Sequence, residues 1–233
     1  MTGVREGRRT KEVRVISCHS NLVRVTTRNV NTARAYRMTQ RRESVEHTRG
    51  RILRAAYDTW LDRPYDQVTL DAVATAAGVS RQTVLRHFGS KDALAIAVVA
   101  WQRPIEEDAR AAEPGDTANA VRRLVDRYET MGDANVRTLE LEGRVAPIDR
   151  LLTEARASHR AWIERTFAPW VGPCRGARRE ELILALYAAT DVTVWKLLRR
   201  DLGGSRARVE SIIRQLVEGV LRPFERAVEE GTS

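Results

Sequence analysis

The stretch Thr69–Lys91, TLDAVATAAGVSRQTVLRHFGSK, constrains the fold most, because its residue spacing predicts two short helices joined by a tight turn. Thr69 is placed to cap the first helix with its hydroxyl. Gly78 follows where a left-handed residue ends a helix at little steric cost. Ser80 is then a second N-cap, and the second helix runs from Arg81 to His87. The apolar face of the first helix is Leu70, Val73, Ala74 and Ala77.

The second of these helices is unusually polar. Its apolar positions are few, namely Val84, Leu85 and Phe88. A short helix with so little apolar surface gains little from packing, so its polar side chains are better explained by what they contact. Two helices in this arrangement present the second one to the major groove of DNA. The polar side chains are Arg81, Gln82, Thr83, Arg86 and His87.

The same residues belong to a longer pattern. The leading segment carries Ile52, Leu53, Ala55 and Ala56, and TLDAVATAAGVS and TVLRHFGSKDAL follow. From about Ser44 to Trp101, roughly a quarter of the chain, this pattern resembles the N-terminal domain of the tetracycline-repressor (TetR) family of bacterial transcription regulators. Leu85 departs from it, because the family usually has a Tyr there. A phosphate contact commonly made by that Tyr is therefore in doubt.

Net charge is unevenly distributed. The chain carries +9, but residues 1–42 hold eleven Arg or Lys against Glu6 and Glu12, so the remaining residues hold 29 basic and 29 acidic side chains and are neutral. The high isoelectric point therefore describes the leading segment alone. We interpret residues 1–42 as a disordered basic extension. It is either an arm that contacts DNA or a segment upstream of a true start at Met38, which we favour.

Other chemistry is not indicated. Cys18 and Cys174 are too few for a disulfide framework, which favours a reducing cytoplasm, and no apolar run is long enough for a membrane span. The four histidines lack metal-ligand spacing, and no phosphate-binding, dinucleotide-binding or nucleophile-elbow motif occurs. We expect no catalytic residue, no metal and no cofactor. An enzyme is the remote alternative, and Cys174 is more simply a loop residue than a redox sensor.

The fold is predicted to be all-α, with a three-helix helix-turn-helix domain at 43–91 and a larger helical domain at 92–233. The first domain starts with a helix from about Ser44 to Leu61. A largely apolar linker helix is expected from Lys91 to about Trp101, ended or bent by Pro104. Further helices are expected from Thr117 to a break at Gly132, at 134–145, from Pro147 onward, at 178–200 and at 205–228, with loops at 170–176 and 203–205.

One recognition helix reads only a few base pairs, so specific binding requires two copies on a two-fold-related, palindromic site in double-stranded DNA. The family pairs its last two helices with those of a second copy in a four-helix bundle. We therefore assign 178–200 and 205–228 to a homodimer interface. Both segments would also suit an ordinary core.

The resemblance also implies a small-molecule pocket in the second domain. Aromatic residues at helical spacing are more often core than ligand contacts, and the sequence says little about the pocket, apart from favouring an apolar or aromatic effector. The candidates are Tyr128, His159, Trp162, Tyr187 and Trp195, with Trp170 nearby.

The sequence thus predicts a DNA-binding transcriptional regulator, most simply a repressor released by a small-molecule effector. A DNA-binding protein without an effector is the alternative. Arg81, Gln82 and Thr83 are expected at base edges or adjacent backbone, whereas His87, Lys91 and Thr69 hold phosphates. Arg86 suits either role. The full set of expected DNA contacts is Thr69, Ser80, Arg81, Gln82, Thr83, Arg86, His87 and Lys91.

Overall fold

The predicted caps and turns of the Thr69–Lys91 stretch are formed. A computed structural model describes the backbone of residues 30–224 and the side chains of residues 38–224. The Thr69 hydroxyl accepts from the Ala72 amide at 3.1 Å, and the Ser80 hydroxyl accepts from the Thr83 amide at 3.1 Å. Gly78 between them is left-handed, with φ 62° and ψ 40°. Each cap satisfies an amide that the first turn of a helix leaves free.

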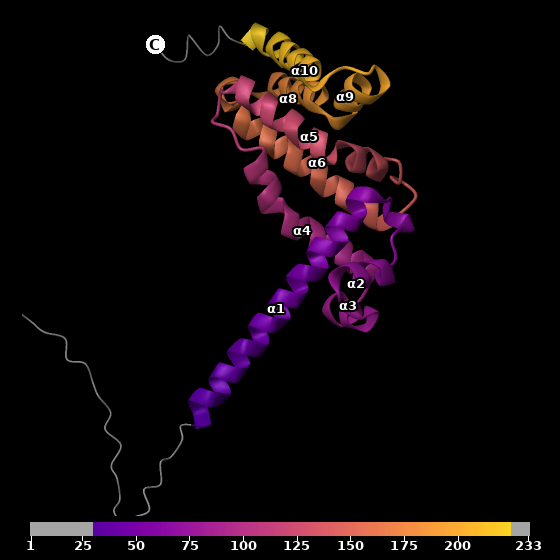
Figure 1. Ribbon diagram of the computed structural model, residues 1–233. Helices are drawn as coiled ribbons and strands as arrows, with labels where there is room; N and C mark the ends of the chain where they lie inside the picture. Colours follow the sequence, from indigo (N-terminus) through magenta and orange to yellow (C-terminus); the bar gives the residue numbers. More distant parts are fainter. Residues whose placement is uncertain (1–29, 225–233) are drawn as a thin grey trace, which may run out of the picture. The chain divides into compact units, whose positions relative to one another are not determined.

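Four helices share the first apolar core. They are α1 (Val30–Asp62), α2 (Leu70–Ala77), α3 (Arg81–Phe88) and α4 (Lys91–Ala109), with a 3-10 turn at Tyr65–Gln67 between α1 and α2 (Figure 1). This core, called the head core below, joins Ile52, Leu53, Ala55, Ala56, Val68, Val73, Ala74, Ala77, Val84, Leu94 and Val98.

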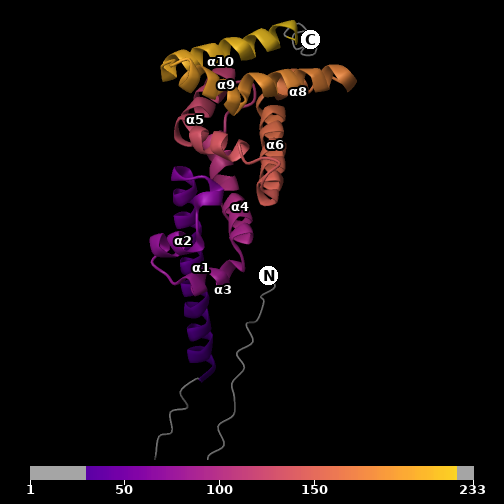
Figure 2. The ribbon, with the colours of Figure 1, turned by 90° about the vertical axis from the view of Figure 1, so that its right-hand side faces the viewer.

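The second core is larger and is built from later helices. These are α5 (Thr117–Leu139), α6 (Ala146–Thr166), α7 (Ala168–Val171), α8 (Gly176–Thr190), α9 (Val192–Lys196), a π-helical turn at Leu197–Asp201, α10 (Arg206–Leu221) and a 3-10 turn at Arg222–Phe224. α10 packs on α5 and α8, and α6 packs on α8. Figures 1 and 2 place α8 and α10 together, at the end of residues 44–224 remote from α2 and α3.

Helix α4 joins the two parts. Leu94 and Val98 near its start lie in the head core, and its later part packs on α6. The parts also meet through side chains: Arg137 of α5 donates to the Leu61 carbonyl oxygen at the end of α1, and Arg127 donates to the Tyr57 hydroxyl at 3.1 Å. Residues 44–224 lie within one compact unit. All the elements among the described residues are helical, which confirms the all-α prediction.

Several predicted helix ends were wrong. α1 begins at Val30, so residues 30–42 of the predicted disordered extension are helical, while residues 1–29 lie outside the described part. This segment has helix-favouring Ala, Arg, Met and Gln but no apolar periodicity, which is why a pattern search misses it. α4 continues past Pro104 to Ala109. Pro104 falls inside a helix that is packed at both ends, and packing overrides propensity there.

Gly132 does not break its helix. α5 runs unbroken from Thr117 to Leu139, and the separate helix expected at 134–145 does not exist, because turns connect Glu140 to Val145. A Cβ atom at Gly132 would lie 2.2 Å from the Trp195 ring. The glycine is therefore a close-packing position and not a terminator.

The predicted helix at 178–200 is interrupted. α8 ends at Thr190, and Asp191 caps a new helix, since its carboxylate accepts from the Thr193 amide at 2.9 Å. A π-helical turn then continues to Asp201. The expected loop at 170–176 starts two residues late, because Trp170 and Val171 lie in α7. The predicted turn at Gly203–Ser205 is confirmed, with Ser205 capping α10. Residues 225–228 of the last predicted helix lie outside the described part.

Candidate nucleic-acid interface and effector cleft

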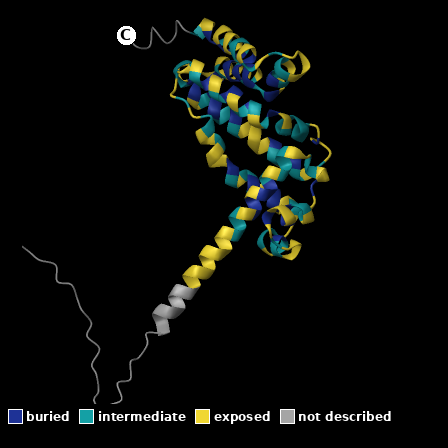
Figure 3. Cartoon of the chain, viewed as in Figure 1, coloured by how far each residue is buried: buried dark blue, intermediate teal, exposed yellow. Residues whose placement is uncertain are grey.

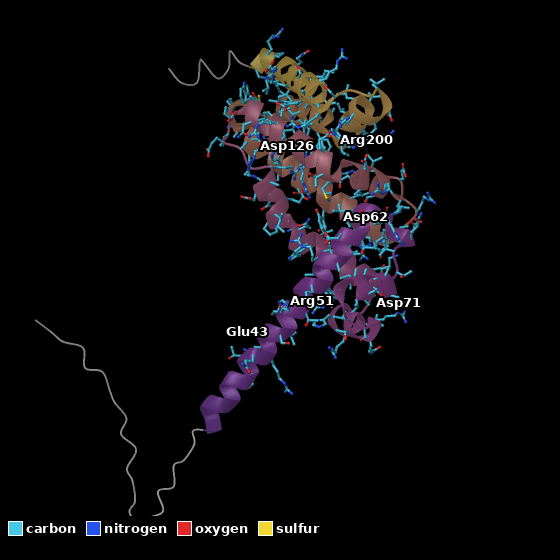
Figure 4. The ribbon with its side chains drawn as sticks, in the orientation of Figure 1. Glu43, Arg51, Asp62, Asp71, Asp126 and Arg200 are labelled. Atoms are coloured by element: carbon cyan, nitrogen blue, oxygen red, sulfur yellow. The ribbon has the colours of Figure 1, made fainter. Side chains whose placement is uncertain are left out.

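The turn between α2 and α3 is held by an arginine from α1. Arg51 donates to the carbonyl oxygens of Ala77 and Gly78, the Gly78 bond being 3.2 Å long (Figure 4). These carbonyls lie at the end of α2, where no amide of the helix reaches them. A Cβ atom at Gly78 would come within 2.8 Å of the Arg51 guanidinium. Arg51 therefore has a structural partner at this turn.

Helix α3 is anchored by one side and exposed on the other. Val84 is 1% exposed and lies in the head core, while Arg81, Gln82 and Arg86 are exposed. Figure 3 shows buried, intermediate and exposed positions together in the region of α2 and α3. The Thr83 hydroxyl lies 2.9 Å from the Ser80 hydroxyl. Leu85 is half-buried. Gln82 and Arg86 are four residues apart and Arg81 is adjacent to Gln82, so these exposed side chains lie on one side of the helix.

Among the described residues, Arg81 is the one arginine of α3 that forms an ion pair with a carboxylate, and its partner is Asp71 of α2. The Arg81 Nε atom lies 3.7 Å from an Asp71 carboxylate oxygen, and both side chains are more than half exposed. An exposed ion pair of this kind contributes little to stability, typically below about 1 kcal/mol. Arg81 can therefore exchange this partner for another anion at small cost.

His87 at the end of α3 lies against cations. Arg49 of α1 stacks 4.5 Å from the centre of the Phe88 ring and donates to the His87 carbonyl oxygen at 3.5 Å. Burial lowers the pKa of His87, and the charges of Arg86 and Arg49 lower it further. The imidazole is therefore neutral at pH 7 and can donate a hydrogen bond but adds no positive charge to this surface.

Lys91 is oriented by an aromatic ring. Its ammonium lies 4.2 Å from the centre of the Tyr65 ring, and Tyr65 in turn donates to a carboxylate oxygen of Asp92. Burial lowers the pKa of Lys91, an effect opposed by Asp66 and Asp92, and burial also raises the pKa of Tyr65. Lys91 thus remains a cation, held at the start of α4 beside the end of α3.

A separate cleft lies where α4 and α6 end. Its volume is about 450 Å³, which is within the range of small-molecule sites. Trp162 is the one predicted pocket candidate that lines it. Its indole N–H donates to the Arg110 carbonyl oxygen at 3.0 Å, which fixes the ring. The lining residues are Glu107, Arg110, Ala111, Ala112, Pro114, Trp162, Arg165 and Thr166.

His159 lies behind this cleft and is buried. Its ring stacks on Trp162 at 5.3 Å and meets the edge of Tyr187 at 4.7 Å. Nδ1 lies 3.2 Å from the Arg110 guanidinium and Nε2 lies 3.0 Å from the Thr190 hydroxyl. Burial and the charge of Arg110 lower the pKa of His159 to about 4. The imidazole is therefore neutral, with Nδ1 accepting from Arg110 and Nε2 donating to Thr190.

The remaining pocket candidates are parts of the core. Tyr128 is buried and donates to the Thr190 carbonyl oxygen at 2.8 Å, and burial raises its pKa. Trp195 is fully buried against Gly132 and donates to Glu129 at 2.9 Å. The sequence singled out neither Arg110 nor Arg165, because no motif marks two arginines that only the meeting of helix ends brings together.

A smaller cavity of about 80 Å³ lies between the head core and α5–α6, lined by residues that include Trp60, Tyr65, Arg137 and Ile148. Within residues 38–224 no group of three or more His, Cys, Asp or Glu side chains is arranged to hold a metal ion. No helix of the described part is long and apolar enough to cross a membrane.

These features define a helix-turn-helix domain attached to a larger all-helical domain. Residues 52–98 match the family model described as bacterial regulatory proteins of the tetR family. The helix-turn-helix segment therefore matches the TetR family model, as its sequence motifs led us to expect.

One curated relative is similar over the N-terminal part of the chain, and solved structures are similar in fold. The chain is 35% identical over 88 residues to the HTH-type transcriptional regulator AlkX of Mycobacterium tuberculosis, a match that covers 38% of this chain and 33% of that relative. A crystal structure of a TetR-family transcriptional regulator from Streptomyces coelicolor is similar in fold, with a TM-score of 0.64, 19% identity and coverage of 79% and 85% of the two chains. A protein from Mesorhizobium loti assigned to the same family gives a TM-score of 0.57, 20% identity and coverage of 77% and 97%.

Proposed function

We propose that the chain is a sequence-specific DNA-binding transcriptional regulator that acts as a homodimer on a palindromic operator. One observation carries the proposal: α3 is anchored through Val84 and exposes Arg81, Gln82 and Arg86. In a helix-turn-helix, the second helix enters the major groove, and its exposed side-chain donors can bind base edges there. The relative AlkX is named as a transcriptional regulator, and its match includes only about a third of that protein.

Base edges and phosphates are contacted by different residues. Arg81, Gln82 and Thr83 lie in the first turn of α3 and are proposed to reach bases or adjacent backbone. Ser80 caps that turn beside them. Thr69, His87 and Lys91 flank α3 and are proposed to hold phosphates, and Arg86 suits either role. Because the side chain of Leu85 is half-buried and apolar, it cannot donate a hydrogen bond to a phosphate.

The dimer is proposed to form through α8 and α10. Leu184 of α8 is 56% exposed and Leu216 of α10 is 43% exposed, although the two helices pack together. Paired helices with exposed leucines at the end remote from α3 are suited to bind the same pair in a second copy. The two α3 helices would then enter successive major grooves.

Release from the operator is proposed to follow effector binding in the α4–α6 cleft, in the cytoplasm. α4 begins directly after α3 and ends at the cleft, so a ligand there acts on the helix that positions the head. Such a ligand weakens DNA binding only if it binds the DNA-incompetent arrangement better.

Selection of bound duplexes from random DNA tests the function. A palindromic consensus bound by the purified dimer is the expected result. Arg81→Ala should relax sequence preference, whereas Lys91→Ala should weaken binding to all sequences and reduce the salt dependence. A protein that enriches no sequence, or two variants that bind the consensus unchanged, would refute the assignment.

A further inference from the structure

Arg110 is a half-buried cation whose Nε atom is enclosed. No carboxylate of the described residues forms an ion pair with it, and its Nε atom has no hydrogen-bond partner. Its neighbours are the face of Trp162, 5.7 Å away, and the neutral His159. Burial lowers the pKa of Arg110 and nearby Arg165 lowers it further, whereas Tyr128, Glu107 and Tyr187 oppose this shift without forming a salt bridge. A guanidinium in such surroundings is costly unless an anion neutralises it.

The surroundings of Arg110 hold its guanidinium in place. Because arginine only donates, His159 Nδ1 accepts from it and His159 Nε2 donates to the Thr190 hydroxyl. Thr190 then donates to the Leu186 carbonyl oxygen at 2.7 Å. This chain of donors ends in the backbone of α8, so each member has a defined direction. Arg110 is thereby oriented by neutral groups that leave its charge available.

The cleft beside Arg110 has the composition of a site for an organic anion. Arg110 and Arg165 are the cations of its lining and Glu107 is the acid, so the lining carries one net positive charge. Ala111, Ala112, Pro114 and the ring of Trp162 supply flat apolar surface. The planar fork of arginine matches a carboxylate. A single net charge fits a monoanion better than a dianion.

We infer that the α4–α6 cleft binds a small organic carboxylate with a flat apolar body, its carboxylate on Arg110 and Arg165 and its body against Trp162. The inference rests on the proposed function only in taking this ligand to be the effector. The sequence favoured an apolar or aromatic effector because it shows no pattern of buried charge, and the proposed ligand adds a carboxylate to such a body.

A matched pair of probes isolates the charge. 2-Naphthoate and 2-naphthamide have the same ring system and nearly the same shape, and only the first is an anion. Titration into the full-length protein, followed by tryptophan fluorescence and calorimetry, should give at least a tenfold lower dissociation constant for 2-naphthoate. Equal affinity for the two probes, or binding of neither, would overturn the inference.

Substitutions locate the site. Arg165→Gln changes an exposed side chain and Arg110→Gln removes the half-buried guanidinium, and each should abolish most of the preference for 2-naphthoate. Arg150→Gln, on the same helix as Arg165 but outside the cleft, is the matched control and should keep it. If Arg165→Gln and Arg110→Gln both retain the full preference, the cleft is not the binding site and the inference is wrong.

DNA binding is measured on the same samples without probe. A protein that binds its selected duplex but does not distinguish the two probes refutes the carboxylate site and leaves the regulator intact. A protein that prefers 2-naphthoate through Arg110 and Arg165 but enriches no DNA sequence supports the site and refutes the proposed function.

Discussion

Gly132 shows how the absence of one carbon atom permits a close helix contact. The Trp195 ring lies where a Cβ atom would be, with three ring atoms between 2.2 and 2.6 Å from that position. We expect Gly132→Ala to lower the free energy of unfolding by about 1–3 kcal/mol, because the buried indole has to move. Gly219→Ala in α10 is the control: nothing lies within 4 Å of its Cβ position, and helix propensity predicts stabilisation by up to about 1 kcal/mol. Urea denaturation measures both, and equal effects would contradict the packing argument.

His159 predicts a pH dependence of stability. Its pKa is about 4 in the folded protein and near the ordinary value of 6.5 when unfolded, so the unfolded chain binds more protons between these values. The contribution of His159 to the free energy of unfolding is therefore fully present above pH 6.5. It is lost as the pH drops towards 4, and the loss is at most about 3 kcal/mol. Arg110, Asp191 and Tyr187 are the ionisable groups that face this ring.

His159→Gln keeps a side-chain acceptor for Arg110 but does not titrate. We expect the loss of stability between pH 6.5 and 4, measured by urea denaturation at each pH, to be smaller in this variant than in the natural protein. Superimposable pH profiles for the two proteins would show that His159 is not buried in its neutral form.

At the scale of the element, local signals were predictable and distant ones were not. Thr69, Gly78 and Ser80 act within three or four residues, so their caps and turn follow from sequence alone. Gly132 was misread because its reason for being small is Trp195, more than sixty residues away. Asp191 was overlooked because an apolar pattern continues on both sides of the cap.

The candidate site divides in the same way. The exposed residues of α3 lie within six positions of one another in sequence, and their pattern is sufficient to identify them. Arg110 ends α4, whereas Arg165 lies at the end of α6, so only the packing of the two helices makes them neighbours. His159 was found as an aromatic at helical spacing, but its role in orienting Arg110 depends on burial that no periodicity reveals.

The hydrogen bonds from Arg51 of α1 to the end of α2 give a prediction at the scale of the element. Arg51→Met keeps the apolar stem and removes the donors to the Ala77 and Gly78 carbonyl oxygens. We expect a loss of about 1–2 kcal/mol, with faster amide hydrogen exchange in α2 and α3 and unchanged exchange in α8. Arg63→Met, on an exposed residue just beyond α1, is the control. Faster exchange throughout the protein, or in neither helix, would contradict a local stabilising role of the Arg51 hydrogen bonds.

At the scale of the whole molecule, the proposed dimer would couple the α8–α10 end of residues 44–224 to the recognition helix α3. Figure 2 shows α8 and α10 at one end of this unit and α3 near the other. If α8 and α10 pair with those of a second copy, this contact sets the separation of the two α3 helices. A single α3 contacts few base pairs, and the second copy supplies the remaining specificity. A change at the α8–α10 end should therefore alter DNA affinity without touching the head.

Leu216→Glu tests this coupling. The leucine is 43% exposed on α10, and a carboxylate there would be buried without a partner if α8 and α10 pair with a second copy. We expect the dimer dissociation constant to rise roughly 100-fold and binding to a palindrome to weaken, while affinity for a half-site is unchanged. Ile105→Glu on α4 is matched in exposure at 44% and should alter neither property. Sedimentation velocity and titration of both duplexes give the measurement. If Leu216→Glu remains dimeric and binds the palindrome normally, the two copies meet through another surface, and the spacing of the α3 helices is set elsewhere.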